Sequence, residues 1–145
     1  MDDQTAKIEL IATSAFGLEA VVARELKDLG YPEVTVENGR VTFTAGLESV
    51  CRANMWLRTA DRVLLKMGEF RAESFDELFE KTKALPWPDW ITVDAAFPVE
   101  GKSVNSKLYS VPDCQAIVKK AIVEKMKLRH KTAWFEETGP RYRVE

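Results

Sequence analysis

Residues 34–43, VTVENGRVTF, are the stretch from which the fold can be predicted. Two short runs of alternating apolar and polar residues flank the dipeptide Asn38-Gly39. This dipeptide is typical of a two-residue β-hairpin turn, because both turn positions then need a positive φ. We therefore expect two antiparallel strands joined by a tight turn at residues 38 and 39.

The segments on both sides of this hairpin continue the pattern. Residues 7–13 (KIELIAT) are mostly apolar and predict a strand, and residues 18–30 predict an amphipathic helix that stops at Gly30. After the hairpin, residues 47–57 predict a second helix and residues 62–70 another strand. The order β-α-β-β-α-β is that of a split, ferredoxin-like unit.

The second predicted helix carries its apolar stripe at helical spacing. The grouped residues are Leu47, Val50, Cys51, Asn54 and Leu57. Cys51 and the other cysteine, Cys114, are far apart in the sequence and each lies among apolar residues. We expect both to be reduced thiols in the core, since their spacing fits neither a metal site nor a disulfide framework.

A second α/β unit follows. The sequence SFDE predicts a capping box with Ser74 at the N-cap, and Pro86 ends that helix. Residues 91–97 predict a strand, and residues 132–145 predict two short strands that turn at Gly139-Pro140. The whole chain is therefore an α+β protein with two expected domains, residues 1–72 and 73–145.

Composition excludes several classes of protein. The chain has 145 residues, a formal net charge of −2 and 46% hydrophobic residues, which is ordinary for a globular protein. It has no apolar run long enough for a membrane span, and its acidic start lacks a signal core, so we expect a cytoplasmic protein. A single histidine and the absence of a G-x-G-x-x-G sequence leave no recognisable catalytic centre or cofactor loop.

Positive charge is concentrated in one part of the chain. Between Lys102 and Lys131 there are eight Lys or Arg and two acidic residues, whereas residues 1–100 carry eleven basic and eighteen acidic residues. An asymmetry of this kind is typical of a surface that meets a polyanion.

A helix is predicted in this basic segment, with Ser110 at the N-cap, Pro112 in the first turn and Asp113 at the positive helix end. Its predicted core face consists of Cys114, Ile117, Val118, Ala121, Ile122 and Leu128, and its opposite face carries Lys120, Lys127 and Lys131. A lysine face of this kind is most often simply solvated. The preceding loop, residues 101–110, favours a binding role because it adds Lys102 and Lys107 near the start of the helix, where backbone amides suit phosphate oxygens.

The chain resembles the N-terminal region of bacterial 23S ribosomal RNA guanine-N2 methyltransferases. The resemblance lies in GLEAVVARELKDLG, LRTADRVLL, FRAESFDELFE and above all FPVEGKSVNSKLYSVPDCQAIVKKAIVEKM. It implies a ferredoxin-like domain followed by a THUMP domain, which is an RNA-binding module. In that family a catalytic domain that uses S-adenosylmethionine follows in the same chain.

The resemblance implies that this chain binds RNA, ribosomal RNA in particular, and presents it to that catalytic domain. We expect the chain to be truncated before the methyltransferase domain and to hold no cofactor itself, since it lacks the polar-Pro-Pro-aromatic motif of the methylation site. The implied RNA-binding residues are Lys102, Ser106, Lys107, Ser110, Lys119 and Lys120. Three further basic residues of the same segment, Lys127, Arg129 and Lys131, extend this set into a basic track. The alternative hypothesis is a ferredoxin-like regulatory domain or protein-interaction scaffold with no nucleic-acid ligand.

Overall fold

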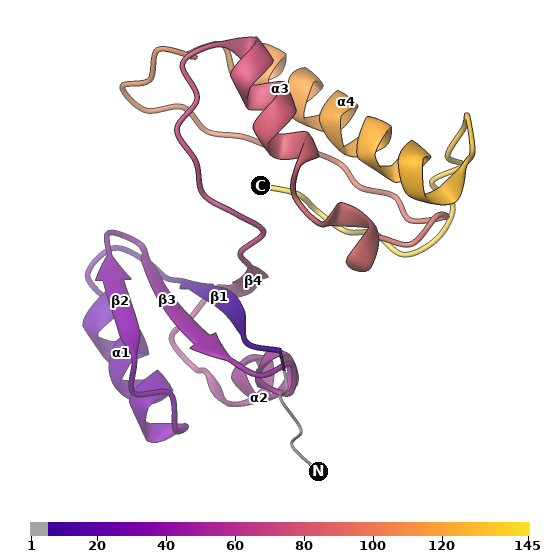
Figure 1. Cartoon of the computed structure of the whole chain (residues 1–145). Coiled ribbons are helices and arrows are strands. Elements are labelled where there is room, and N and C mark those ends of the chain that lie inside the picture. The colour runs from indigo at the N-terminus through magenta and orange to yellow at the C-terminus, as the bar shows by residue number, and fades with distance from the viewer. Residues whose placement is uncertain (1–5) are drawn as a thin grey trace. The chain divides into compact units, whose positions relative to one another are not determined.

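The computed structural model describes residues 6–145, which divide into two compact units. The first unit ends at Lys66 and the second begins at Met67. Each is a separate arrangement of helices and extended segments, as Figure 1 shows. The first five residues of the predicted first domain lie outside the described part of the chain.

The first unit has the predicted order of elements. They are β1 (Ile8–Thr13), α1 (Glu19–Asp28), β2 (Val34–Glu37), β3 (Arg40–Ala45), α2 (Ser49–Trp56) and β4 (Arg62–Leu65). The four strands form one sheet in the order β2-β3-β1-β4, and all neighbouring strands are antiparallel. This confirms the ferredoxin-like unit, although β4 is shorter than the strand predicted at residues 62–70.

The core of this unit lies on one face of the sheet. Leu10 in β1 lies opposite Phe43 in β3, and both are fully buried. Val22 and Leu26 of α1 are buried in the same cluster. The alternation of buried and less buried residues along β1 and β3 is that of a sheet with one face in the core.

The predicted hairpin is confirmed, but its turn differs in one respect. Gly39 has a φ of 74°, whereas Asn38 does not have a positive φ, so the prediction that both turn residues need one was wrong. The turn is held from outside the dipeptide. The Gly39 amide donates to a carboxylate oxygen of Glu19 at 2.8 Å, and the Gly39 carbonyl accepts from the Ser14 amide at 2.9 Å.

The buried face of α2 agrees with the prediction only in part: Val50 and Leu57 pack against the core, but both are only partly buried. Ser49 and Ala53 are its fully buried residues, whereas Cys51 and Asn54 are exposed. Leu47, which precedes the helix, is also largely exposed. Small residues one turn apart let a helix lie close to a sheet, and the Ser49 hydroxyl is satisfied by donating to the Gly46 carbonyl. The expectation of a core thiol was therefore wrong for Cys51, and Cys114 is only partly buried; both cysteines are free.

The second unit contains two helices that pack side by side, α3 (Phe75–Lys83) and α4 (Val111–His130), and a short 3-10 helix, η1 (Trp87–Asp89). Ser74 is the N-cap of α3, and its hydroxyl accepts from the Glu77 amide at 3.2 Å. The Glu77 carboxylate accepts from the Glu73 amide at 3.1 Å, one residue before the donor of a standard capping box.

The strands predicted at residues 91–97 and 132–145 do not form as regular strands. Instead, residues 96–100 and 140–144 pair in parallel through two isolated bridges, Ala96 with Arg141 and Val99 with Val144. Hydrogen bonds of 2.7–2.9 Å join the two segments, including one from the Tyr142 amide to the Ala96 carbonyl. The pairing stays irregular because Pro98 and Pro140 have no amide hydrogen to donate.

Residues 96–100 and 140–144, which together form the paired segment, share one core with α4. Phe97, Ile122 and Met126 are fully buried, together with Trp87, Ile91 and Ala95. The Trp87 indole donates to the Thr82 carbonyl at 2.8 Å, so this ring closes the end of α3 against the core.

We expect the stability of the first unit to depend on pH through Glu19. The hydrogen bond from the Gly39 amide, with a further one from Gly17, lowers the pKa of the Glu19 carboxyl below its ordinary value of 4.5. A carboxyl with a lowered folded-state pKa contributes stability above its unfolded pKa, and this contribution is lost as the pH falls through the folded pKa.

We expect Glu19→Gln to reduce the urea midpoint of unfolding at neutral pH and to reduce it less below pH 4.5. Glu33→Gln, a change at an exposed carboxylate of the same unit, serves as the control. A difference between wild type and Glu19→Gln that stays constant across this pH range would contradict the assignment.

Candidate nucleic-acid interface

The rotation of α4 about its axis decides which of its basic residues face solvent. Ala121, Ile122 and Met126 are its buried residues. Leu128, predicted on the core face, is 68% exposed, and the prediction was wrong there. The buried face therefore centres on Ile122 and includes Met126, which the sequence analysis did not select.

The middle of α4 presents Lys120 to solvent next to α3. The Lys120 ammonium lies 5.9 Å from the centroid of the Phe79 ring, and the Lys83 ammonium lies 5.7 Å from the same centroid. Two cations from different helices thus lie near one ring. Lys127, two turns further along, is half-buried and forms an ion pair with Glu124 at 3.2 Å.

Lys119 lies on the other side of α4 and is engaged within the protein. Its ammonium donates to the Phe97 carbonyl at 2.9 Å, forms an ion pair with Glu137, and lies 3.6 Å from the centroid of the Phe97 ring. These partners belong to the paired segment and to the chain that follows α4. Lys119 therefore joins α4 to its neighbours, whereas Lys120, the next residue, faces solvent.

The loop before α4 is held together around Leu108. The Leu108 carbonyl accepts from the Ser103 hydroxyl at 3.0 Å, and its amide donates to the Ser106 hydroxyl at 3.2 Å. Lys102 and Ser106 line a pocket of about 360 Å³ beside this loop, and Leu78, Val111 and Val118 are among its apolar residues. The loop thus places an exposed lysine at the rim of a partly apolar hollow.

Two other predicted residues of this region already have partners. The Lys107 ammonium lies 3.6 Å from a Glu73 carboxylate oxygen. Ser110 is the N-cap of α4, as predicted, but its hydroxyl donates to the Asp113 carboxylate at 2.6 Å and makes no capping hydrogen bond. Ser110 therefore shapes the start of the helix.

The far end of α4 carries the last two predicted residues. Arg129 is exposed and lies 3.8 Å from the Asp89 carboxylate of η1. Lys131 is the C-cap, with a φ of 51°, so it lies beyond the helix and the prediction that it continues the helical lysine face was wrong. A second pocket of about 360 Å³ lies at this end, and Lys125 and Arg129 are among its lining residues.

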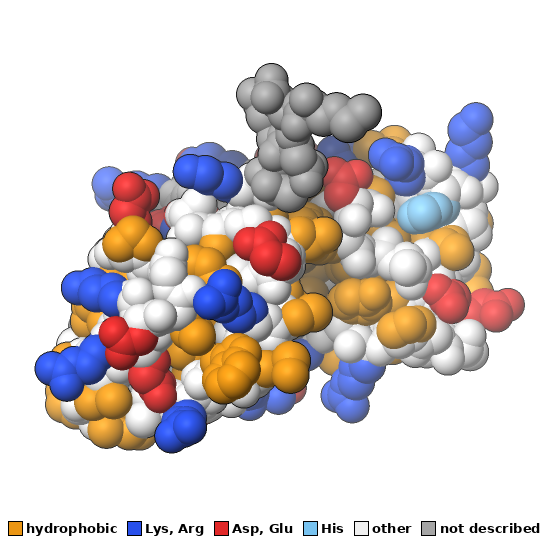
Figure 2. Space-filling model, turned by 90° about the horizontal axis from the view of Figure 1, so that it is seen from below, with side chains coloured by type: hydrophobic (Ala, Val, Ile, Leu, Met, Phe, Trp, Pro, Cys, Tyr) orange, Lys and Arg blue, Asp and Glu red, His pale blue; other side chains and the backbone are white. Residues whose placement is uncertain are grey.

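The predicted residues therefore form an extended set of three groups. The loop residues lie at the start of α4, Lys120 and Lys127 lie along it, and Arg129 and Lys131 lie at its end. A helix of 20 residues is about 30 Å long, so no small ligand can touch all three groups. Figure 2 shows another side of the molecule, on which basic, acidic and hydrophobic side chains are interspersed.

This arrangement suits an elongated polyanion better than a small substrate. Residues 6–145 contain no cluster of His, Cys, Asp or Glu that could hold a metal ion. Within the same range, none of the helices combines the length and the apolar character needed to cross a membrane.

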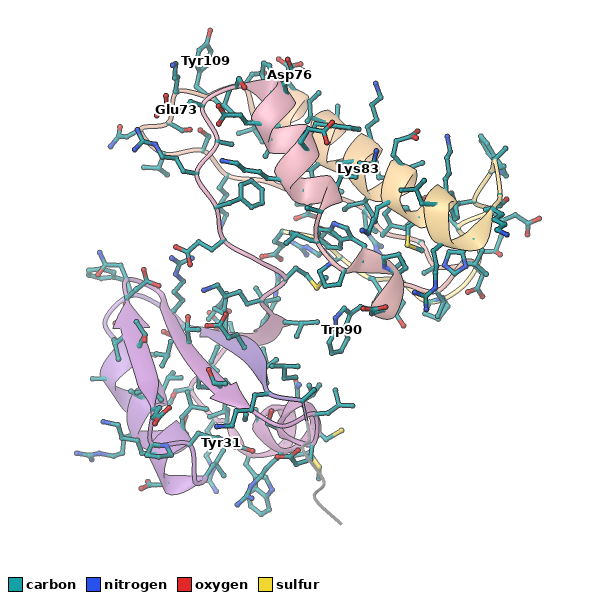
Figure 3. The ribbon with its side chains drawn as sticks, viewed as in Figure 1. Tyr31, Glu73, Asp76, Lys83, Trp90 and Tyr109 are labelled. Carbon is teal, nitrogen blue, oxygen red and sulfur yellow. The ribbon has the colours of Figure 1, made fainter. Side chains whose placement is uncertain are left out.

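The structure adds three residues that the sequence analysis did not select. Lys83 shares the Phe79 ring with Lys120, and Arg71 lies beside Glu73, the partner of Lys107. Tyr109 follows Lys107 by two residues and is 81% exposed, and Figure 3 shows its side chain directed outward. An aromatic residue close to lysines in a loop was the one available indication in the sequence.

Two family models match the chain in succession. Residues 9–64 match the RlmL ferredoxin-like domain, and residues 72–145 match the THUMP domain. The chain belongs to the THUMP domain family. These matches confirm the resemblance to the N-terminal region of THUMP-domain ribosomal RNA methyltransferases and agree with the α+β architecture.

Named relatives are longer proteins. The chain is 58% identical over 141 residues to "Putative RNA methyltransferase YpsC" of Bacillus subtilis, covering 96% of this chain and 36% of the relative. It is 33% identical over 124 residues to ribosomal RNA large subunit methyltransferase K/L of Syntrophotalea carbinolica, covering 86% of this chain and 17% of that protein.

Solved structures share the fold over most of this chain. A predicted N6-adenine-specific DNA methylase from Listeria monocytogenes superposes with a TM-score of 0.90 at 55% identity, over 94% of this chain and 36% of that one. A second structure, "SMU.472, a putative methyltransferase complexed with SAH", gives a TM-score of 0.89 at 42% identity, over 94% of this chain and 37% of that one. The chain thus spans about a third of the length of the Bacillus subtilis relative and of both solved structures, and 17% of the K/L protein.

The different partners of Lys119 and Lys120 lead to a stability prediction. We expect Lys119→Ala to lower the free energy of unfolding by about 1–2 kcal/mol, because it removes a charged hydrogen bond to a carbonyl and a contact with the Phe97 ring. Lys120→Ala should change it by less than about 0.5 kcal/mol, as is usual for exposed positions. Urea titrations of both variants test this, and equal losses would contradict a structural role for Lys119.

Proposed function

We propose that this chain is the RNA-binding part of an RNA methyltransferase. It would hold structured RNA in a position where a catalytic domain of the same longer protein can methylate it. The observation that carries the proposal is the THUMP-domain match over residues 72–145, which includes every residue of the extended basic set.

The finer features of this proposal come from the named relatives. Ribosomal RNA as the substrate follows the K/L relative, and guanine N2 as the methylated atom follows the resemblance of the sequence. S-adenosylmethionine would be used by the catalytic domain, in line with the SAH complex of one structural relative. In this arrangement residues 1–72 and 73–145 are the two domains that deliver the RNA.

The phosphate contacts can be assigned by exposure and by partner. We assign them to Lys102, Lys107, Lys120 and Lys127, and Arg129 and Lys131 extend the track to the end of α4. Lys120 is exposed, and Lys107, Lys127 and Arg129 are held only by partly exposed ion pairs, which are weak in water. Lys119 and Ser110 support the site by fixing α4.

Electrostatics sets the expected strength of binding. The chain carries a net charge of −2, so the acidic residues elsewhere oppose RNA at long range. Attraction is therefore local to α4 and its loop, and it falls as salt shortens the range of the field. Each phosphate neutralised contributes about −0.7 to −0.9 to the slope of log affinity against log salt. Weak, salt-sensitive binding by the isolated chain is the expected behaviour.

A double substitution on α4 tests the proposal. Lys120→Glu with Lys127→Glu removes two attractions and adds two repulsions, so RNA affinity at low salt should fall by at least about tenfold. Neither lysine is fully buried, and thermal melts should show a folded protein. Fluorescence anisotropy with ribosomal RNA fragments across a salt series measures the affinity.

The matched control places the same charge change on the first unit. Arg24→Glu with Lys27→Glu alters two exposed residues of α1 and should cost less affinity if RNA follows α4. Equal losses would indicate diffuse charge, and no loss in either variant would favour the protein-interaction scaffold. Duplex DNA of matched length belongs in the same titration, because one structural relative is described as a DNA methylase.

A further inference from the structure

One carboxylate in the second unit is held between two cations from distant parts of the chain. Arg71, which precedes α3, forms an ion pair with Oε1 of Glu73. Lys107, in the loop before α4, lies 3.6 Å from Oε2 of the same carboxylate. Each oxygen of Glu73 therefore has its own cation, and the carboxylate bridges the segment before α3 to the basic loop.

This bridge lies at the surface and is weakly held. The Arg71 and Lys107 side chains are 86% and 72% exposed, and the Glu73 side chain is 43% exposed. Ion pairs at such exposure contribute little to stability, so another anion can take the place of the carboxylate at small cost. The backbone of Glu73 is held separately, by the hydrogen bond from its amide to Glu77.

A phosphodiester has the chemistry to replace this carboxylate. It presents two anionic oxygens, and guanidinium and ammonium groups bind phosphate with charge-assisted hydrogen bonds. Binding of RNA also releases the counterions condensed on its phosphates, and this adds a favourable term that the internal Glu73 carboxylate cannot supply. The two cations are thus already gathered around one anion in the absence of RNA.

An exposed aromatic ring lies close to this group in sequence. Tyr109 follows Lys107 by two residues, and Leu108 between them is fixed through both its amide and its carbonyl. Figure 3 shows Tyr109 and Glu73 at the same end of the second unit. An exposed ring next to a backbone segment that is held in place is a platform on which an unpaired base can stack.

We propose that Glu73 occupies a phosphate site formed by Arg71 and Lys107, and that RNA binds there by displacing the Glu73 carboxylate while an adjoining unpaired base stacks on Tyr109. This inference rests on the proposed function and specifies it further. The RNA presents at least one unpaired nucleotide next to the phosphates that bind along α4. Glu73 then acts as a competitor built into the protein, which keeps the two cations in place and weakens the binding of polyanions that lack the unpaired base.

The central test is removal of the competing charge. Glu73→Gln should raise affinity for an RNA hairpin with an unpaired tract by about fivefold at low salt, the effect of one unit charge about 4 Å away in water. Glu80→Gln is the matched control, because it removes an exposed carboxylate of α3. It should change affinity less. Equal gains in the two variants would overturn the proposal.

A double-mutant cycle tests whether Lys107 is the cation that is released. Lys107→Gln should weaken RNA binding more in the Glu73→Gln background than in the wild type, where Glu73 already competes for the ammonium. Arg71→Gln should behave in the same way. Additive effects within experimental error would show that Glu73 and the two cations act independently, and would count against a shared site.

Tyr109→Ala separates stacking from charge. It should lower affinity for the hairpin with an unpaired tract by about tenfold while leaving the salt slope and the binding of a blunt duplex unchanged. A loss that is equal for both RNAs would overturn the stacking part of the proposal.

The two levels of the proposal fail in different ways. If the wild-type chain binds no RNA, or the α4 double substitution has no effect, the proposed function fails and this inference fails with it. If the α4 double substitution weakens binding but Glu73→Gln behaves like Glu80→Gln, only the inference fails. If a protein competes with RNA for the Glu73→Gln variant and removes its gain in RNA affinity, the site belongs to that protein and the inference is overturned.

Discussion

The packing of Ile122 and Met126 against Phe97 is the constraint on which the basic surface depends. A helix with lysines at several angles has no defined basic face until its rotation is fixed. Once Ile122 and Met126 point into the core, Lys120 faces solvent beside α3 and Lys119 faces the paired segment. Two adjacent lysines of identical chemistry thereby have different surroundings, because their side chains differ by about 100° around the helix.

The first unit shows how far local sequence rules reach. The hairpin and the order of elements were predictable because they depend on the Asn38-Gly39 turn and on apolar periodicity. The buried face of α2 was predictable only in part: Val50 and Leu57 do pack against the core, but its two fully buried residues are Ser49 and Ala53, and hydrophobicity gives them no priority over Leu47 or Cys51. The turn itself needed a partner from elsewhere, since the Glu19 carboxylate that holds Gly39 comes from the start of α1.

In the second unit, the charge count located the basic segment but could not show which of its basic residues face solvent and which contact the rest of the protein. Leu128 was placed in the core by its spacing, yet it lies near the end of α4, where it is largely exposed. Residues 91–95 form a turn, with a hydrogen bond from the Ala95 amide to the Thr92 carbonyl, and only residues 96–100 and 140–144 pair, where Pro98 and Pro140 have no amide to donate. The bridge from Arg71 through Glu73 to Lys107 joins residues on either side of α3, and no local pattern predicts it. The RNA-binding roles of the basic residues remain predictions.

The parallel pairing of residues 96–100 with 140–144 has a consequence for synthesis on the ribosome. The first unit is complete once β4 has emerged, because its sheet uses only residues up to Leu65. The second unit pairs residues 96–100 with residues 140–144, so α3 and α4 leave the exit tunnel before the segment that completes this pairing. During that interval Phe97 can already pack on Ile122 and Met126, but the backbone amides and carbonyls of residues 96–100 lack their partners and are open to other chains in the cell. A delay in translation beyond α4 would therefore lengthen the period in which this unit can aggregate or require a chaperone.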